Sequence, residues 1–253
     1  MDVTDKVAFV VGGASGMARA TAEGLHAKGA HVAIIDRPES AGAEVAEALG
    51  GTFHPVDVTD HVAAEAALAA AFEAHGSLSV AVNTAGGGRA GRTLSKDGPM
   101  ALEDFQYVVD LNLIATFNLN RLQAWYMSGN EPNEDGERGV IINTASIAAF
   151  EGQIGQVSYS AAKAGIAGMS LTMARDLGTL GIRVNAIAPS LFATGSTARL
   201  TDDKTARLTE DNAFPRRMGK PEEYARLALA IVDNPMLNGG TIRLDAGQRF
   251  APR

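Results

Sequence analysis

Short apolar runs alternate with alanine-rich stretches along most of this chain, and this alternation limits its fold more than any other feature. The runs are rich in Val and Ile and carry no polar residue at every second position, so they predict strands buried on both faces. Such strands occur in parallel sheets that helices cover on both sides. The expected strands lie at 6–12, 31–37, 52–58, 78–86, 139–146, 182–189 and 240–247.

Helical stretches lie between these strands, and no linker separates one part of the chain from another. The expected helices are 16–29, 41–49, 61–74, 103–128, the stretch around Tyr159 and 221–233. Strands that alternate with helices form βαβ units. We therefore expect residues 1–253 to form one doubly wound α/β domain of Rossmann type, with a seven-stranded parallel sheet and helices on both faces. A long connection at about 190–220 is expected to hold the substrate loop.

Composition excludes several classes of protein. The chain has 253 residues, a net charge of -7 and no cysteine, which rules out disulfides and thiolate metal sites. An acidic chain without a basic block is not expected to bind nucleic acid. No apolar run reaches the ~18 residues that a membrane helix needs. The five histidines lack metal-ligand spacing, so we expect no metal. We expect a soluble, cytoplasmic protein that acts on a small-molecule substrate.

A glycine-rich turn, VGGASGMA, follows the first expected strand and opens the first helix. Glycine tolerates a positive φ and lets another group approach the backbone closely. The N-terminus of the helix adds free N–H groups and partial positive charge, which suit a pyrophosphate. The turn therefore predicts a dinucleotide site that includes Gly12, Ser15, Gly16 and Met17.

Asp36 ends the second expected strand, 20 residues after Gly16. A carboxylate at this place accepts hydrogen bonds from both hydroxyls of an adenosine ribose and repels a 2′-phosphate. We therefore expect NAD rather than NADP as the cofactor. Arg37 follows directly and can pair with a phosphate, so NADP stays open as the alternative.

Tyr159 and Lys163 are four residues apart in a run of small residues. On a helix they share one face. An ammonium group near a phenol favours the phenolate, so we expect Lys163 to lower the pKa of Tyr159 from its usual value of about 10. Tyr159 can then exchange a proton with a substrate oxygen. Ser146 ends the preceding strand and can hold the same oxygen.

Together, the glycine turn, the strand end NTAG at 83–86 and the Ser…Tyr-x-x-x-Lys set resemble the short-chain dehydrogenase/reductase family. The resemblance implies that Tyr159 is the general acid/base, that Ser146 positions the reacting oxygen, and that Lys163 binds the nicotinamide ribose. It implies that Asn112 anchors a water next to Lys163. Further cofactor contacts that it implies are Asp57, Val58, Asn83, Ala85, Gly86, Pro189, Leu191 and Thr194.

Within that family, residues 130–169 and the insertion GNEPNEDGERG look like the type 2 3-hydroxyacyl-CoA dehydrogenases. That likeness implies NAD-linked oxidation of 3-hydroxyacyl-CoA thioesters by a homotetramer. The expected substrate contacts are Ser146, Gln153, Gln156, Tyr159, Leu191 and Phe192. Two alternatives remain: an NADPH-dependent 3-oxoacyl-carrier-protein reductase, which Asp36 disfavours, and a non-catalytic dinucleotide-binding scaffold, which has no need of the catalytic set.

Overall fold

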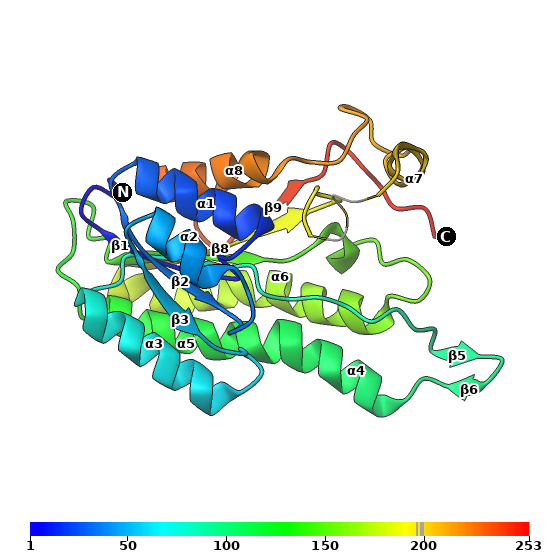
Figure 1. Cartoon of the computed structure of the whole chain (residues 1–253), viewed down its shortest axis with the longest axis horizontal. Helices are drawn as coiled ribbons and strands as arrows, with labels where there is room; N and C mark the ends of the chain where they lie inside the picture. The colour runs from blue at the N-terminus through cyan, green and yellow to red at the C-terminus, as the bar shows by residue number, and fades with distance from the viewer. Residues whose placement is uncertain (196, 198–199, 253) are drawn as a thin grey trace.

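Seven parallel strands form the central sheet of the computed structural model, in the order β3-β2-β1-β4-β7-β8-β9 (Figure 1). The structure describes residues 1–195, 197 and 200–252. The strands are β1 (Val7–Val11), β2 (His31–Asp36), β3 (Thr52–Pro55), β4 (Val80–Asn83), β7 (Gly139–Thr144), β8 (Ile182–Pro189) and β9 (Thr241–Leu244). The prediction of a seven-stranded parallel sheet is confirmed.

The order of the strands reverses between β1 and β4, which both lie in the middle of the sheet. From β1 the chain first builds outward through β2 to β3, and then returns to add β4 on the other side of β1. The connections that leave the carboxyl ends of β1 and β4 therefore run to opposite sides. A crevice opens where they part, and ligands bind at such a place in open α/β sheets.

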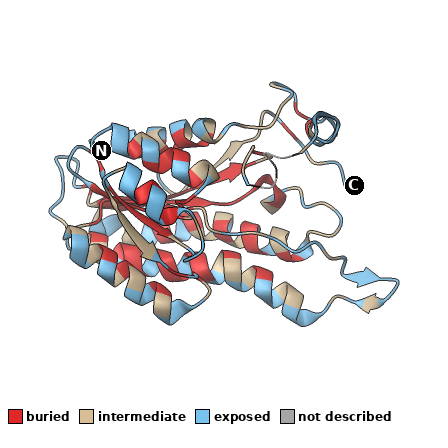
Figure 2. Ribbon diagram, in the orientation of Figure 1, coloured by how far each residue is buried: buried red, intermediate tan, exposed pale blue. Residues whose placement is uncertain are grey.

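Helices cover both faces of the sheet (Figure 1). One layer holds α1 (Gly16–Ala27), α2 (Gly42–Ala48) and α8 (Pro221–Asp233). The other holds α3 (His61–His75), α4 (Leu102–Val109), α5 (Ala115–Ser128) and α6 (Val157–Leu177). Each helix turns its buried residues toward the strands and its exposed residues outward (Figure 2). Among the described residues, no helix is long and apolar enough to cross a membrane.

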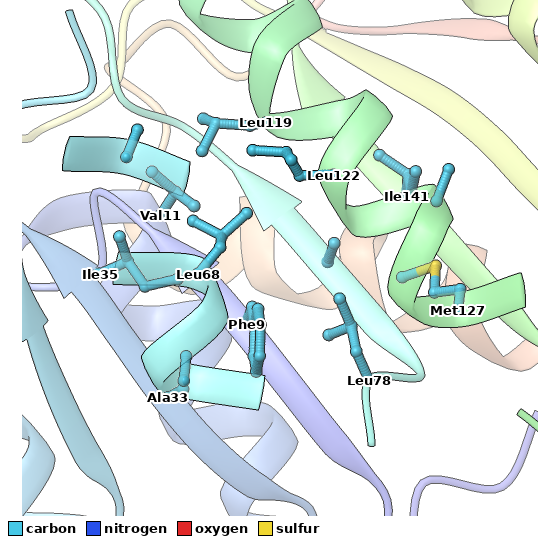
Figure 3. Close-up of a cluster of buried hydrophobic side chains, with 14 of the residues drawn as sticks. Phe9, Val11, Ala33, Ile35, Leu68, Leu78, Leu119, Leu122, Met127 and Ile141 are labelled. Carbon is cyan, nitrogen blue, oxygen red and sulfur yellow. The ribbon is translucent and has the colours of Figure 1, made fainter. Parts of the chain in front are cut away.

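The hydrophobic core lies in two slabs, one on each face of the sheet. Phe9 and Ile141 of the strands meet Leu68 of α3 and Leu119 of α5 in one slab (Figure 3). The other slab packs strand residues against Leu25, Tyr224 and other side chains of α1, α2 and α8. Because both faces are covered, the strands contain apolar residues throughout, as the sequence pattern requires.

The structure differs from the sequence prediction in three connections. The helix expected at 103–128 is interrupted by a π-helical turn, η1 (Asp110–Ile114). A hairpin of β5 (Leu94–Ser95) and β6 (Gly98–Pro99) is too short to leave a periodic pattern. The long connection before α8 contains α7 (Asp202–Leu208), and residues 196, 198 and 199 of the predicted substrate loop lie outside the described residues. Two short 3-10 helices, η2 (Ile147–Ala149) and η3 (Gly178–Leu180), flank α6.

Candidate active site

A cleft of about 770 Å³ opens at the carboxyl ends of the strands, where the strand order reverses. Its walls come from the segments that follow β1, β2, β3, β4, β7 and β8. Most of the predicted site residues line this cleft: Gly12, Ser15, Gly16, Met17, Asp36, Asp57, Val58, Ala85, Gly86, Ser146, Tyr159, Lys163, Pro189, Leu191, Phe192 and Thr194. Residues scattered over the whole sequence are thus brought into one site.

The glycine turn has the backbone that the sequence predicts. Gly12 has a φ of +79°, and a Cβ there would lie 2.7 Å from Oγ1 of Thr84. Gly16 has a φ of +55°, and its Cβ would lie 2.8 Å from the methyl carbon of Thr194. Only glycine fits both places. The turn leads into the N-terminus of α1, where Ser15 is the N-cap and makes no side-chain capping bond. Bare backbone at a helix N-terminus fits the pyrophosphate of a dinucleotide.

Both carboxylate oxygens of Asp36 accept hydrogen bonds from the backbone. Ala14 of the glycine turn donates to Oδ2 at 2.9 Å, and the N–H of Arg37 donates to Oδ1 at 2.7 Å. Each oxygen keeps lone pairs for a ligand that enters the cleft. The guanidinium of Arg37 pairs with Glu39 at 3.0 Å on the surface. This end of the cleft therefore offers hydrogen-bond acceptors to a ligand.

Asp57 lies beside the same end of the cleft. Its Oδ1 accepts hydrogen bonds from the N–H and the hydroxyl of Thr59, at 2.9 and 2.7 Å. These bonds lower the pKa of Asp57, and the charge of Arg37 adds to the effect. The bonds fix the turn after β3 that carries Val58, a buried residue of the cleft wall.

Lys163 is buried in α6, and its ammonium donates a 2.8 Å hydrogen bond to the main-chain oxygen of Thr144 at the end of β7. Burial lowers the pKa of Lys163 to about 8, because the charged form loses its hydration. With a pKa of about 8, Lys163 exchanges its proton within the range of pH in which enzymes are usually assayed.

Asn112 lies in the π-helical turn η1 and is fully buried. Its amide donates to the oxygens of Gly87 and Val108 at 2.7 and 2.8 Å, and its Oδ1 accepts from the N–H of Gly87 at 3.2 Å. A Cβ on Gly86 would lie 2.6 Å from that Oδ1 and 3.4 Å from Nζ of Lys163. Asn112 thus fixes the segment after β4 against the lysine. π-helical turns are frequent at functional sites for such reasons.

Tyr159 and Ser146 are hydrogen-bonded to each other in the same cleft as Lys163. Burial raises the pKa of Tyr159, and a hydrogen bond with the Ser146 hydroxyl opposes part of that rise. Ser146 also accepts the N–H of Ala148 at 3.1 Å as the N-cap of η2. The prediction that Lys163 lowers the pKa of Tyr159 is wrong. Nζ of Lys163 lies 5.6 Å from the centroid of the tyrosine ring and donates its hydrogen bond to the Thr144 carbonyl. Burial is therefore the main cause of the shift in the pKa of Tyr159.

Besides the buried Asn112, three predicted residues do not line the cleft. The side chain of Asn83 turns away from the cleft and donates to Asn120, Gln123 and Asn143, at 2.9, 2.9 and 3.0 Å, in a buried group of amides. Gln153 and Gln156 lie in the loop after η2, outside the residues that line the cleft. Gln153 donates to the main-chain oxygen of Ala251 at 3.3 Å, so it holds the C-terminal segment.

Arg89 and Tyr107 are cleft residues that the sequence did not predict. The guanidinium of Arg89 lies 3.9 Å from the centroid of the Tyr107 ring and pairs with Asp104 at 3.0 Å. They come from the loop after β4 and from α4, where no motif indicates a site. Phe192 lines the cleft too, but its ring is buried against Gly219. In the described part of the chain, no three His, Cys, Asp or Glu residues are placed to hold a metal.

The family model for short chain dehydrogenase matches residues 6–205, which include the glycine turn and the Ser146, Tyr159 and Lys163 set. The chain belongs to this family. It is therefore an oxidoreductase, and the short-chain dehydrogenase fold implies a nicotinamide dinucleotide as its cofactor. The glycine turn and Asp36 fit that group.

Individual relatives agree over the full length. This short-chain dehydrogenase is 50% identical to the 3-hydroxyacyl-CoA dehydrogenase type-2 of Drosophila melanogaster, over 99% of this chain and 100% of the relative. It is 50% identical to the Homo sapiens enzyme of the same name, over 97% of this chain and 96% of the relative. The crystal structure of the Mycobacterium avium 3-hydroxyacyl-CoA dehydrogenase type-2 superposes with a TM-score of 0.92 at 40% identity, covering 98% and 97% of the two chains.

Proposed function

We propose that this short-chain dehydrogenase interconverts 3-hydroxyacyl-CoA and 3-oxoacyl-CoA thioesters, with NAD as the hydride acceptor. The observation that carries the proposal is the 50% identity to relatives named 3-hydroxyacyl-CoA dehydrogenase type-2, which extends over whole chains. The meeting of Ser146, Tyr159 and Lys163 in one cleft supports the chemistry.

The residues of the cleft have distinct roles in this proposal. A nicotinamide held in this cleft would supply the hydride acceptor for alcohol oxidation and the hydride donor for ketone reduction. The hydroxyl of Ser146 holds the substrate oxygen, and the phenol of Tyr159 exchanges a proton with it. Because burial raises the pKa of Tyr159, the phenol keeps its proton at neutral pH and can act as an acid. In the oxidation direction, the same phenol takes up the proton that leaves the substrate hydroxyl.

The choice of NAD rests on the adenosine end of the cleft. Asp36 presents a carboxylate where the ribose hydroxyls are expected, and a 2′-phosphate there would meet a like charge. Arg37, the residue that could pair with such a phosphate, is bound to Glu39. These contacts favour NAD over NADP, and they disfavour the NADPH-dependent carrier-protein reductase.

Steady-state kinetics with acetoacetyl-CoA test this function. We expect fast oxidation of NADH, at least 10-fold slower oxidation of NADPH at equal concentration, and weak reduction of simple ketones that lack the CoA group. If the protein reduces simple ketones but not acetoacetyl-CoA, the substrate proposal is wrong. If NADPH is the better cofactor, the assignment of Asp36 is wrong.

We also propose that the enzyme is a homotetramer that works in the cytoplasm. Trp125 and Phe117 of α5 are 73% and 51% exposed, and large apolar side chains on one helix suit a subunit contact. The lack of cysteine agrees with a reducing compartment. Sedimentation equilibrium gives the mass directly. A monomer at micromolar concentration would contradict the tetramer.

A further inference from the structure

Tyr224 is a fully buried tyrosine of α8 whose hydroxyl lies 2.7 Å from Oγ1 of Thr144. Thr144 is the last residue of β7, and its main-chain oxygen accepts the hydrogen bond from Lys163. The two partners of Thr144 come from opposite layers, because α8 covers one face of the sheet and α6 the other (Figure 1).

We propose that Tyr224 is a positioning residue for Lys163. Tyr224 of α8 holds the end of β7 from one face of the sheet. The Thr144 carbonyl therefore stays in place to accept the hydrogen bond from the Lys163 ammonium, which lies on the other face.

The end of β7 needs such a support because it loses one neighbour there. The pairing of β4 with β7 ends at Asn83 and Asn143, so Thr144 has a paired strand only on the β8 side. On that side, the N–H of Ala145 donates to the oxygen of Ile187 at 2.8 Å. The Thr144 oxygen accepts a hydrogen bond from the ammonium of Lys163. Tyr224 supplies a second constraint on the same residue.

The buried pair of hydroxyls on Tyr224 and Thr144 also costs free energy that a purely apolar core would not require. A buried hydroxyl must keep a partner, or it loses its hydration without compensation. An apolar pair of the same shape would fill this space at little or no loss of stability. A hydrogen bond fixes a distance and a direction, which apolar packing does less strictly. The pair is therefore suited to orientation.

The surroundings of Lys163 make its anchoring measurable. In the described structure, it is faced by Tyr159 from its own helix, by Asn112 from η1 and by the Thr144 carbonyl from β7. A hydrogen bond from the ammonium to that carbonyl favours the charged form. If the carbonyl moves, the charged form loses support and Lys163 gives up its proton at lower pH.

Three variants separate positioning from mere packing: Tyr224→Phe, Thr144→Val and the double variant. Each single change leaves one buried hydroxyl without its partner, so we expect both to lower the melting temperature. The double change removes both hydroxyls and is expected to recover most of that loss. If the pair orients Lys163, the double variant remains impaired in catalysis although its stability recovers.

The catalytic readout is the alkaline limb of the pH profile of kcat/KM for ketone reduction with NADH, which is the range in which kcat/KM falls as pH rises. In this proposal, that fall follows the loss of the proton from Lys163. We expect this limb to move to lower pH in all three variants, with a loss of about 3- to 10-fold at pH 8. A second readout uses the cofactor-free protein: an NMR titration of 13C-labelled lysine, assigned with Lys163→Met, is expected to show the same direction for Lys163. The proposal is overturned if the double variant regains the wild-type limb, or if no variant changes the titration of Lys163.

Ser170→Ala is the matched control, because Ser170 is another buried hydroxyl and donates within α6, to the main-chain oxygen of Ile166 at 3.0 Å. We expect it to lower stability and leave the alkaline limb in place; a shift of equal size would show that any lost hydroxyl moves it and would overturn the proposal. The inference rests on the dehydrogenase reaction but not on the acyl-CoA substrate. Any ketone that the wild-type protein reduces serves, so failure with acetoacetyl-CoA alone counts only against the proposed substrate.

Discussion

The N–H of Ala14 donates a 2.9 Å hydrogen bond to Oδ2 of Asp36, across 22 residues of sequence. The carboxylate that is proposed to bind the adenosine ribose therefore also holds the glycine turn that is proposed to bind the pyrophosphate. Two parts of one ligand site are joined by a single side chain, and a change at this residue acts on both.

Asp36→Ala is expected to weaken NADH binding by about 10-fold or more, because hydrogen bonds to a charged group are lost. NADPH binding is expected to weaken less, since a repelling charge disappears at the same time. Isothermal titration calorimetry with both cofactors measures the change. Asp36→Asn is the control, because it keeps an acceptor for Ala14. An unaltered NADH affinity in Asp36→Ala would contradict the role of this carboxylate.

Tyr159→Phe is expected to lower kcat by about 100-fold or more, because the change removes the phenol that is proposed to exchange the proton. The ring remains and still packs against Gly88. NADH affinity and melting temperature are therefore expected to stay close to those of the parent protein. Stopped-flow fluorescence gives the affinity and steady-state assays give kcat. Turnover within 3-fold of the parent value would exclude Tyr159 as the proton carrier.

Gly86→Ala is expected to lower kcat/KM by about 10-fold or more, because its Cβ would lie 2.6 Å from Oδ1 of Asn112 and must displace it. Gly168→Ala is the matched control in α6, where an added Cβ meets no atom within 4 Å among the described residues. That variant is expected to gain up to about 1 kcal/mol in unfolding free energy. Equal activity of the two variants would show that the Gly86 contact does not matter for catalysis.

Lys163→Met is expected to unfold at higher denaturant concentration than the parent protein at pH 7. The pKa of Lys163 is lowered from 10.5 to about 8, so between these values the unfolded chain binds more protons than the folded chain. The contribution of Lys163 to the unfolding free energy therefore rises with pH over that window. The advantage of Lys163→Met, at most about 3 kcal/mol at pH 7, shrinks toward pH 10.5.

Urea titrations at pH 7 and pH 10 measure this difference. Lys204→Met is the control, because it makes the same replacement at a lysine that is exposed on α7 rather than buried. A stability difference between Lys163→Met and the parent that does not vary with pH would show that Lys163 titrates normally.

Local sequence predicted the parts of the site that local rules govern. The positive φ values of Gly12 and Gly16 follow from the place of the glycines between a buried strand and a helix. Ser146, Tyr159 and Lys163 share a cleft because a strand end, and a helix face with four-residue spacing, place them there. Most of the strands were predicted too long, because the expected ranges include residues of the turns next to the strands; only the range 182–189 matches its strand, β8.

The face on which a side chain lies was harder to predict. Asn83 and Gly86 belong to one motif, yet Asn83 turns into the buried amides and Gly86 into the cleft. Successive side chains of a strand point to opposite faces, so the motif alone does not say which of its members reach a ligand. The π-helical turn at Asn112 is likewise invisible in the periodicity of the stretch that contains it.

The α/β class, the parallel sheet, the glycine turn and the identities of the reactive groups depend on patterns within short segments, so they can be predicted from the residues alone. The bond from Lys163 to the Thr144 carbonyl, the contact of Tyr224 with Thr144 from the opposite layer, and the pKa of Tyr159 that burial raises depend on the assembled fold. Hydrogen-bond partners and burial depend on which segments, distant in sequence, pack together, and that is fixed only when the sheet and its two helical layers assemble.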